Sequence, residues 1–277
     1  MYLTRFRFNA ARTGARRLLT SPQMLHAAVM SSFPDAPPTP DGGPRVLWRI
    51  DYNSAAEVLL YVTSPARPDL THLVEQAGWP TAEPQGWSTY DYATFLTGLS
   101  ADSVWAFRLT ANPVHSIRRK EGEPTKRTAH RTPRYQIEWL LKQQDRGGFA
   151  IVEKAPEARR LERGDEYELA VGGARGLSFS KNSASSVMNG SPFGMNSSPF
   201  GMNSSPFGNS SASSVKDSSA HRGSSATAGR NAVRIAAVTY QGRLRVTDPE
   251  VFRLRLASGL GKAKAYGCGL MTLAPVV

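Results

Sequence analysis

The stretch Gly259–Gly269 contains the residue types expected of a loop that binds an anion. Its four glycines allow positive φ angles and close approach of the backbone to a ligand, and Lys262 and Lys264 add charge without an acidic neighbour. No Ser or Thr follows the Gly-Lys pair as in a P-loop, and the glycines are not spaced as GxGxxG. We therefore expect a nucleic-acid backbone as the partner, in preference to a nucleotide cofactor. The alternative is a plain surface turn.

Histidines are the side chains that could transfer protons near neutral pH, and they stand at positions 26, 72, 115, 130 and 221. No two of them have the spacing of a metal-ligand pair, and there is no cysteine cluster or constellation of Asp and Glu. We therefore expect neither a metal site nor a cofactor. If the chain cleaves nucleic acid, a metal-free route selects RNA, because its 2′-hydroxyl can serve as an internal nucleophile. A histidine could then act as acid or base while nearby cations stabilise the phosphorane.

The charge of the chain favours an anionic partner. Its 277 residues carry a formal charge of +12, with a pI near 10.1. The basic side chains concentrate in residues 1–17, 108–134 and 230–264, which predicts one composite basic face. No apolar run approaches the roughly 18 residues of a membrane span, so nucleic acid is preferred to a membrane surface. The single cysteine, Cys268, is expected to pack in a protein of the reducing cytoplasm.

Hydrophobic patterns predict a first unit with the order β-α-β-β-α-β of a ferredoxin-like domain. The expected strands cover residues 2–9, 45–51, 57–63 and 104–111, and the expected helices cover 21–33 and 68–77. Ser21 and Pro22 are typical of a helix start, and His26 lies at the edge of the apolar stripe of that helix. A basic loop is expected before this helix, and residues 78–103 fit no clear pattern.

A second unit is expected after a basic loop over residues 118–131. Its predicted helices cover residues 132–146 and 249–257, and its predicted strands cover 149–153, 167–171, 233–240, 243–246 and 270–273. Gln241 and Gly242 are expected to form the turn between two of these strands. We therefore predict an α+β fold with an N-terminal domain over residues 1–116 and a C-terminal domain over 117–277.

Residues 176–230 interrupt the second unit with a segment rich in Ser, Gly and Asn. Three copies of a heptad containing Ser-Pro-Phe-Gly lie within it, and Pro and Gly disfavour a helix while seven residues are too few for a solenoid repeat. We predict a disordered insertion. The alternative is a tether whose phenylalanines bind a partner.

Several segments of the chain resemble those of the CasE family, the endoribonucleases that process CRISPR RNA in type I-E systems. The similar segments are Met1–Thr4, Leu25-His26, Phe107–Pro113, Gly259–Leu270 and Leu273–Pro275. The resemblance implies tandem ferredoxin-like (RRM-like, RAMP) domains. It also implies metal-independent cleavage of a CRISPR repeat RNA below its hairpin, and retention of the product within the Cascade surveillance complex.

Carried over by position, the resemblance implies that His26 is catalytic and that Lys264 is the lysine of the glycine loop. Two residues depart from the family pattern. Gln23 stands where many relatives have a tyrosine, so any tyrosine role is absent or supplied elsewhere, for instance by Tyr2, and Lys262 replaces a frequent proline. The full set of predicted RNA-binding residues is Tyr2, Arg5, Arg16, Arg17, Lys126, Arg127, Arg131, Lys262 and Lys264.

Two functions remain open from the sequence. The leading one is an endoribonuclease in which His26 acts as acid or base and a cyclic phosphate results. The other is a non-catalytic RNA-binding subunit of the same kind of complex, in which His26 only packs. His115 and His130 could contact RNA or be solvated.

Overall fold

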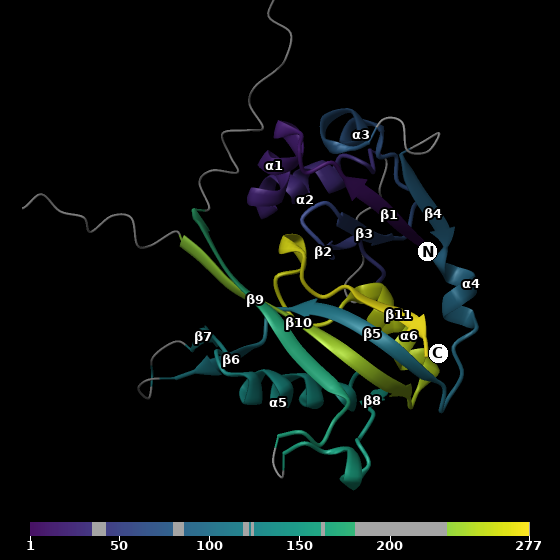
Figure 1. Ribbon diagram of the computed structural model, residues 1–277, viewed down its shortest axis with the longest axis vertical. Coiled ribbons are helices and arrows are strands. Elements are labelled where there is room, and N and C mark those ends of the chain that lie inside the picture. Colours follow the sequence, from purple (N-terminus) through teal and green to yellow (C-terminus); the bar gives the residue numbers. More distant parts are fainter. Residues whose placement is uncertain are drawn as a thin grey trace, which may run out of the picture. The chain divides into compact units, whose positions relative to one another are not determined.

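The computed structural model describes residues 1–34, 43–79, 86–118, 122, 125–161, 164–180 and 232–276 (Figure 1). The chain divides into a main body, formed by residues 1–177 and 234–277, and a separate part formed by residues 178–233. Everything below concerns the main body, which contains both of the sheet-and-helix units predicted from the sequence. Apart from residues 176–180, the predicted insertion lies outside the described residues, so its disorder stays a prediction.

A first antiparallel sheet carries the N-terminal half of the chain. Its elements are β1 (Tyr2–Phe8), α1 (Thr13–Thr20), α2 (Pro22–Met30), β2 (Leu47–Tyr52), β3 (Val58–Ser64), α3 (Thr71–Ala77) and β4 (Trp87–Asp91). The strand order is β2-β3-β1-β4. Alternation along β1 buries Phe6 and Phe8 against Leu18, Leu25 and Leu73 of the three helices. One face of this sheet is therefore covered by helices, and Arg5 points to the opposite face.

A second sheet repeats this plan. Along the chain, the first sheet is followed by α4 (Tyr92–Thr97). The elements after it are β5 (Val104–Ala111), β6 (Val114–Ile117), β7 (Lys126–Ala129), α5 (Pro133–Gln144), β8 (Phe149–Ile151), η1 (Pro156–Ala158), β9 (Leu169–Ser180), β10 (Ala232–Val246), α6 (Pro249–Ser258), η3 (Lys264–Tyr266) and β11 (Met271–Pro275). The order is β11-β5-β10-β8, with β9 paired to β10. In both sheets the fourth strand of the unit lies beside the first, and the third separates the first from the second. The predicted tandem ferredoxin-like architecture is confirmed.

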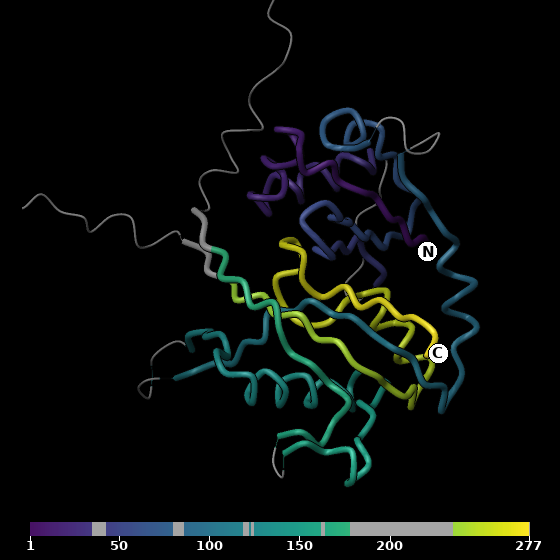
Figure 2. The backbone as a smooth tube through the Cα atoms, viewed as in Figure 1, coloured from purple at the N-terminus to yellow at the C-terminus, as the bar shows by residue number. Residues whose placement is uncertain are grey.

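The prediction that residues 104–111 complete the first unit is wrong. β5 pairs with β10 and β11, so it opens the second unit, and β4 supplies the fourth strand of the first. Figure 2 shows the C-terminal segment, in yellow, running beside the β5 segment. Alternation showed which face of β5 is buried but carried no information about its neighbours. The pairing favours a boundary between Asp91 and Val104 over the predicted one after residue 116.

Two local predictions also fail. α1 occupies the region expected to be a basic loop, because Ala15 and Leu18 bury an apolar edge among the arginines. The expected turn at Gln241 and Gly242 is instead part of the continuous strand β10. A Cβ on Gly242 would collide with the carbonyl oxygen of Glu168, so this glycine permits close approach of a neighbouring segment.

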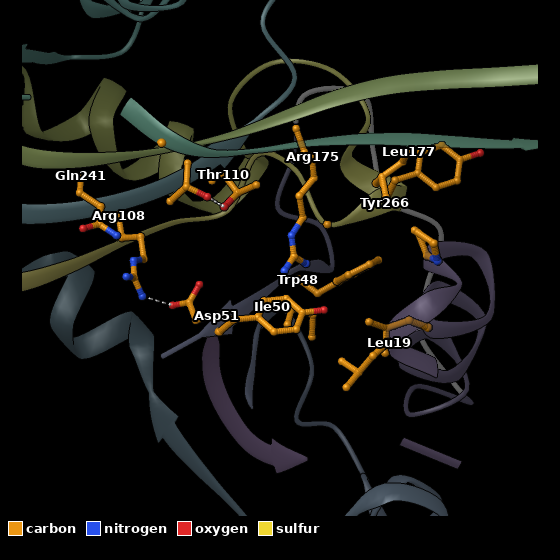
Figure 3. Close-up of a pocket in the computed structure, with 18 of the residues that line it drawn as sticks. Leu19, Trp48, Ile50, Asp51, Arg108, Thr110, Arg175, Leu177, Gln241 and Tyr266 are labelled. Carbon is orange, nitrogen blue, oxygen red and sulfur yellow. Dashed lines mark hydrogen bonds and ion pairs between the residues drawn. The ribbon is translucent and has the colours of Figure 1, made fainter. Parts of the chain in front are cut away.

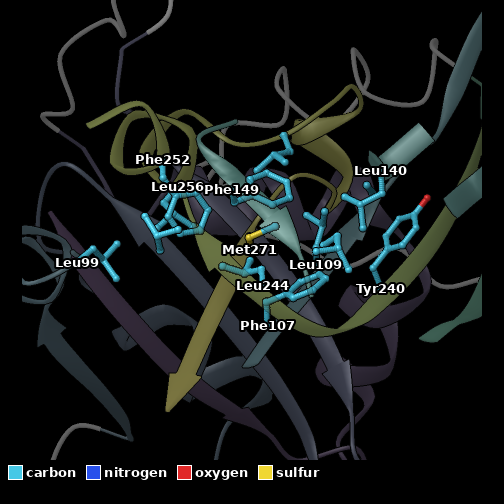
Figure 4. Close-up of a cluster of buried hydrophobic side chains, with 14 of the residues drawn as sticks. Leu99, Phe107, Leu109, Leu140, Phe149, Tyr240, Leu244, Phe252, Leu256 and Met271 are labelled. Carbon is cyan, nitrogen blue, oxygen red and sulfur yellow. The ribbon is translucent and has the colours of Figure 1, made fainter. Parts of the chain in front are cut away.

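The core of the second unit lies between its sheet and helices α5 and α6 (Figure 4). Phe107 and Leu109 of β5 pack there with Leu244 of β10 and with Phe252 and Leu256 of α6. The alternate residues of these strands face the other way, toward the first sheet. Within the described ranges, no helix is long and apolar enough to cross a membrane.

Candidate active site

Helix α2 positions His26. Ser21 caps its start, with the hydroxyl oxygen accepting from the Met24 amide at 3.3 Å, and Pro22 occupies the first helical position, as predicted. Leu25 and Val29 are buried, so His26 lies at the rim of the apolar face and is half-buried.

The ring of His26 contacts the next strand of the fold. The indole Nε1–H of Trp48, on β2, donates to Nδ1 of His26 at 3.4 Å. Burial lowers the pKa of His26 below 6.5, because removal from water disfavours the charged imidazolium. His26 is therefore a predominantly neutral imidazole at pH 7, a form that suits proton transfer.

The glycine loop after α6 has the predicted positive φ angles, between 75° and 94° at its four glycines. These glycines allow close contact with side chains of the protein itself, whereas the sequence predicted close contact with a ligand. A Cβ on Gly267 would come within 2.6 Å of the Trp48 ring, and one on Gly261 within 3.0 Å of the Trp139 ring. The glycines therefore let the loop close onto two indole rings of the protein itself. A bond from the Gly269 amide to the Thr110 carbonyl, at 2.7 Å, ties the loop to β5.

A group of cations surrounds Lys264 in this loop. The pKa of Lys264 is lowered, first by burial and then by the positive charges of Arg45, Arg255 and Lys262. Every charged side chain that shifts this pKa is thus a cation, an arrangement that an anion would stabilise. Nε of Arg45 is buried and has no hydrogen-bond partner among the described residues. Because η3 packs against α2, the turn that carries Lys264 meets the helix that carries His26.

A cleft of about 460 Å³ opens beside this site and is lined by residues of α1, α2 and β2 and by residues of β5, β9 and β10 (Figure 3). Trp48 and Tyr266 line it at the His26 end. Deeper in, Arg108 pairs with Asp51 at 3.1 Å. The guanidinium of Arg175 lies 3.8 Å from the centre of the Tyr52 ring.

Other predicted residues lie at different distances from His26. Arg16 and Arg17 are exposed on α1, and this helix packs against the helix that carries His26. Arg5 lies on the sheet face opposite to α2 and is separated from His26 by the sheet. In the described part of the chain, Tyr2 makes no side-chain hydrogen bond to His26. Tyr266 of η3 is better placed for a tyrosine role, because its turn packs against α2.

The remaining predicted RNA-binding residues belong to the β6–β7 hairpin and its exit. Lys126, Arg127 and Arg131 are all exposed there, and the hairpin lies apart from α2 (Figure 1). The rings of His115 and His130 lie against each other at a tilt of 32°, with centres 4.3 Å apart. Burial, followed by the charge of His115, lowers the pKa of His130. The predicted basic residues thus form at least two separate groups, one at His26 and one on this hairpin.

Sequence reasoning missed Trp48, Arg45 and Arg255. Nothing in the sequence around Trp48 indicates a functional role, because its pattern is that of an ordinary core residue of a strand. The two arginines could have been suspected only from the basic composition. His72, in contrast, has a packing role, since its Nε2 contacts the Ala28 carbonyl at 2.9 Å and joins α3 to α2. Across the described ranges, no group of three or more His, Cys, Asp or Glu side chains could hold a metal ion.

Known proteins share this fold and sequence pattern. The family model described as CRISPR associated protein matches residues 1–275. The chain is 25% identical over 276 residues to CRISPR-associated endoribonuclease Cse3 of Thermus thermophilus, covering 99% of this chain and 100% of that protein.

Solved structures give the same answer for the fold. Thermus thermophilus Cse3 bound to an RNA representing a pre-cleavage complex has a TM-score of 0.62 at 23% identity, covering 99% of this chain and 98% of that one. Cas6e from Escherichia coli K-12 has a TM-score of 0.55 at 18% identity, with both chains covered completely (100%). The resemblance noted in the sequence is confirmed, and the chain belongs to the CRISPR-associated protein family.

Proposed function

We propose that this protein is an endoribonuclease that cleaves a CRISPR repeat RNA at the base of its hairpin and keeps the product. The observation that carries the proposal is the meeting of α2 with η3. It brings a half-buried, neutral His26 to a turn whose Lys264 is surrounded by cations. Proton transfer and stabilisation of a phosphorane need these two kinds of group together.

The reaction would use the RNA's own nucleophile. The 2′ oxygen forms a bond to phosphorus while the bond between phosphorus and the 5′ oxygen breaks, which leaves a 2′,3′-cyclic phosphate and a 5′-hydroxyl. The proton lost by the 2′-hydroxyl and the proton gained by the 5′ oxygen balance, so no water is consumed. His26 serves one of these two transfers, and the cations around Lys264 stabilise the charge on the phosphoryl oxygens. This chemistry requires no metal ion.

Binding of the RNA would extend beyond the cleaved bond. Arg16 and Arg17 lie on the helix that packs against α2 and suit phosphates near the cleavage point, whereas Lys126, Arg127 and Arg131 suit a more distant part of the hairpin. A grip at two separate places would hold the product after cleavage. Retention in turn suits a subunit that remains with its RNA in a larger surveillance complex.

Replacement of His26 by Ala tests the catalytic proposal. With the cognate repeat RNA, we expect a loss of about 10² to 10⁴ in the single-turnover cleavage rate, as for removal of a general acid or base, with hairpin affinity nearly unchanged. His72→Gln is the matched control, because glutamine can still donate to the Ala28 carbonyl, and its rate should stay at the wild-type level.

Two further arms examine the mechanism. EDTA should leave the rate unchanged, and a 2′-deoxy substitution upstream of the scissile phosphate should block the wild-type protein. Cleavage by His26→Ala at the wild-type rate, or a requirement for Mg²⁺, would refute the mechanism. RNA binding without cleavage by the wild-type protein would favour the second candidate, a non-catalytic RNA-binding subunit, which the presence of Gln23 keeps open.

A further inference from the structure

Two exposed arginines lie on the face of the first sheet opposite its helices. Arg5 and Arg7 alternate along β1 with Phe6 and Phe8, which are buried against the helices, so both arginines point to the other face. Within the described residues, neither arginine forms an ion pair. The cleavage site proposed above does not use them, because the sheet separates them from His26.

Aromatic rings flank these arginines. Arg5 stands opposite Tyr61 of β3, and Tyr90 of β4 pairs with the residue two positions before Arg5. Residues opposite each other in paired strands share a face, so the two tyrosines lie on either side of β1, and β4 is the edge strand of the sheet (Figure 1). The guanidinium of Arg7 lies 5.6 Å from the centre of the Trp79 ring. Tyr90 is 54% exposed and Trp79 is 37% exposed, so both rings are open to a ligand.

An exposed surface that combines arginines with aromatic rings matches the chemistry of single-stranded RNA. The unpaired bases of a single strand stack on aromatic side chains, and its phosphates pair with arginines. A base-paired hairpin keeps its bases stacked inside and presents no such faces. Among the described residues of β1, β3 and β4, the single acid is Asp91. It lies on the other face of the sheet, opposite Tyr2, and accepts from the Ala93 amide and the Thr94 hydroxyl.

We propose that this face of the first sheet is a second RNA site, which binds a single-stranded segment with its phosphates on Arg5 and Arg7. The exposed rings of Tyr90 and Trp79 stack the bases of that segment. A rise of about 3.4 Å per residue puts the two arginines about 7 Å apart along β1, so they engage different phosphates. The inference goes beyond the proposed cleavage, because it concerns RNA outside the hairpin and a face that the sheet separates from His26.

Binding of a fluorescently labelled oligouridine to the full-length protein tests the site, because this probe forms no hairpin. Tyr90→Ser should weaken the affinity measured by anisotropy about tenfold, through the loss of one stacked base, whereas Tyr90→Phe keeps the ring and should stay within about twofold of wild type. Arg5→Gln should reduce the slope of log affinity against log salt by about 0.7, the value for one phosphate contact on a single strand.

Arg243→Gln is the matched control. It removes the same charge from a strand of the second sheet, but its guanidinium is already paired with Glu168, so affinity and salt slope should not change. If the wild-type protein did not bind the oligouridine at low salt, or if Tyr90→Ser and Arg5→Gln bound it as the wild type does, the proposal would be wrong. Equal weakening by Arg5→Gln and Arg243→Gln would also overturn it, because net charge alone would then account for binding.

Cleavage of a bare hairpin, without single-stranded flanks, separates this proposal from the catalytic one. Tyr90→Ser should cleave the bare hairpin at the wild-type rate, and His26→Ala should bind the oligouridine with wild-type affinity. Loss of oligouridine binding in His26→Ala would contradict a separate site. Because the two readouts use different RNAs, the single-stranded site can fail while His26→Ala still abolishes cleavage, and the converse result is equally visible.

Discussion

Arg49 holds the two sheets together, and its replacement by Met should cost several kcal/mol of stability. Its side chain, 2% exposed, donates to both Asp51 oxygens at 2.7 and 2.9 Å within the first sheet. It also reaches the second sheet, where it donates to the Arg108 carbonyl at 2.7 Å, the Leu270 carbonyl at 3.1 Å and the Thr272 hydroxyl at 2.8 Å.

The magnitude follows from what the substitution leaves behind. Removal of one partner of a buried ion pair typically costs about 3 to 5 kcal/mol, because the other charge stays buried. Arg108 still pairs with Asp51 at 3.1 Å, so we expect the lower end of that range, about 3 kcal/mol. For a protein of this size, that loss corresponds to a fall in melting temperature of about 6 to 12 °C.

Arg5→Met provides the control for this measurement. Arg5 lies on the same face of the same sheet but is exposed, so its replacement should change stability by no more than about 0.5 kcal/mol. Urea denaturation followed by tryptophan fluorescence and circular dichroism gives both values. A loss below about 1 kcal/mol for Arg49→Met, or an equal loss for both variants, would refute the reasoning.

Two more predictions concern the electrostatics of the site. His26 should titrate below 6.5, because burial lowers its pKa in the folded protein. As the pH falls below 6.5, the unfolded chain therefore takes up a proton at His26 before the folded protein does, and the free energy of unfolding decreases. An NMR midpoint at or above 6.5 would contradict this. Lys264→Ala should weaken RNA binding and reduce the slope of log affinity against log salt by about 1. Lys154→Ala, which removes an ammonium already paired with Asp165, should leave that slope unchanged.

Local chemistry explains which parts of the fold the sequence could predict. Asp248 and Pro249 begin α6 as Ser21 and Pro22 begin α2, because capping involves only the first turn of a helix. The aliphatic and aromatic alternation of β1 likewise required only its own residues. These local signals were enough to place His26 on a helix edge.

Long-range contacts explain what was missed. The partners of β5 are set by residues more than 100 positions later in the chain, and nothing within β5 specifies them. The bond from Trp48 to His26 joins residues 22 positions apart on different elements. Sequence patterns could suggest a histidine and a lysine loop, whereas the side chain that lies between them could be found only from the fold.

The arrangement of the site gives a physical reason for a buried arginine. His26 and Trp48 belong to the first sheet and its helices, whereas Lys264 lies on the connection between α6 and β11 of the second. A small shift between the sheets would separate the histidine from the cations, and catalysis is sensitive to displacements of about 1 Å. Removing the Arg49 guanidinium from water is costly, but its directional bonds fix the register of one sheet against the other. A hydrophobic side chain could fill the same space but could not specify that register, so we expect Arg49 to contribute to the geometry of the candidate active site as well as to stability.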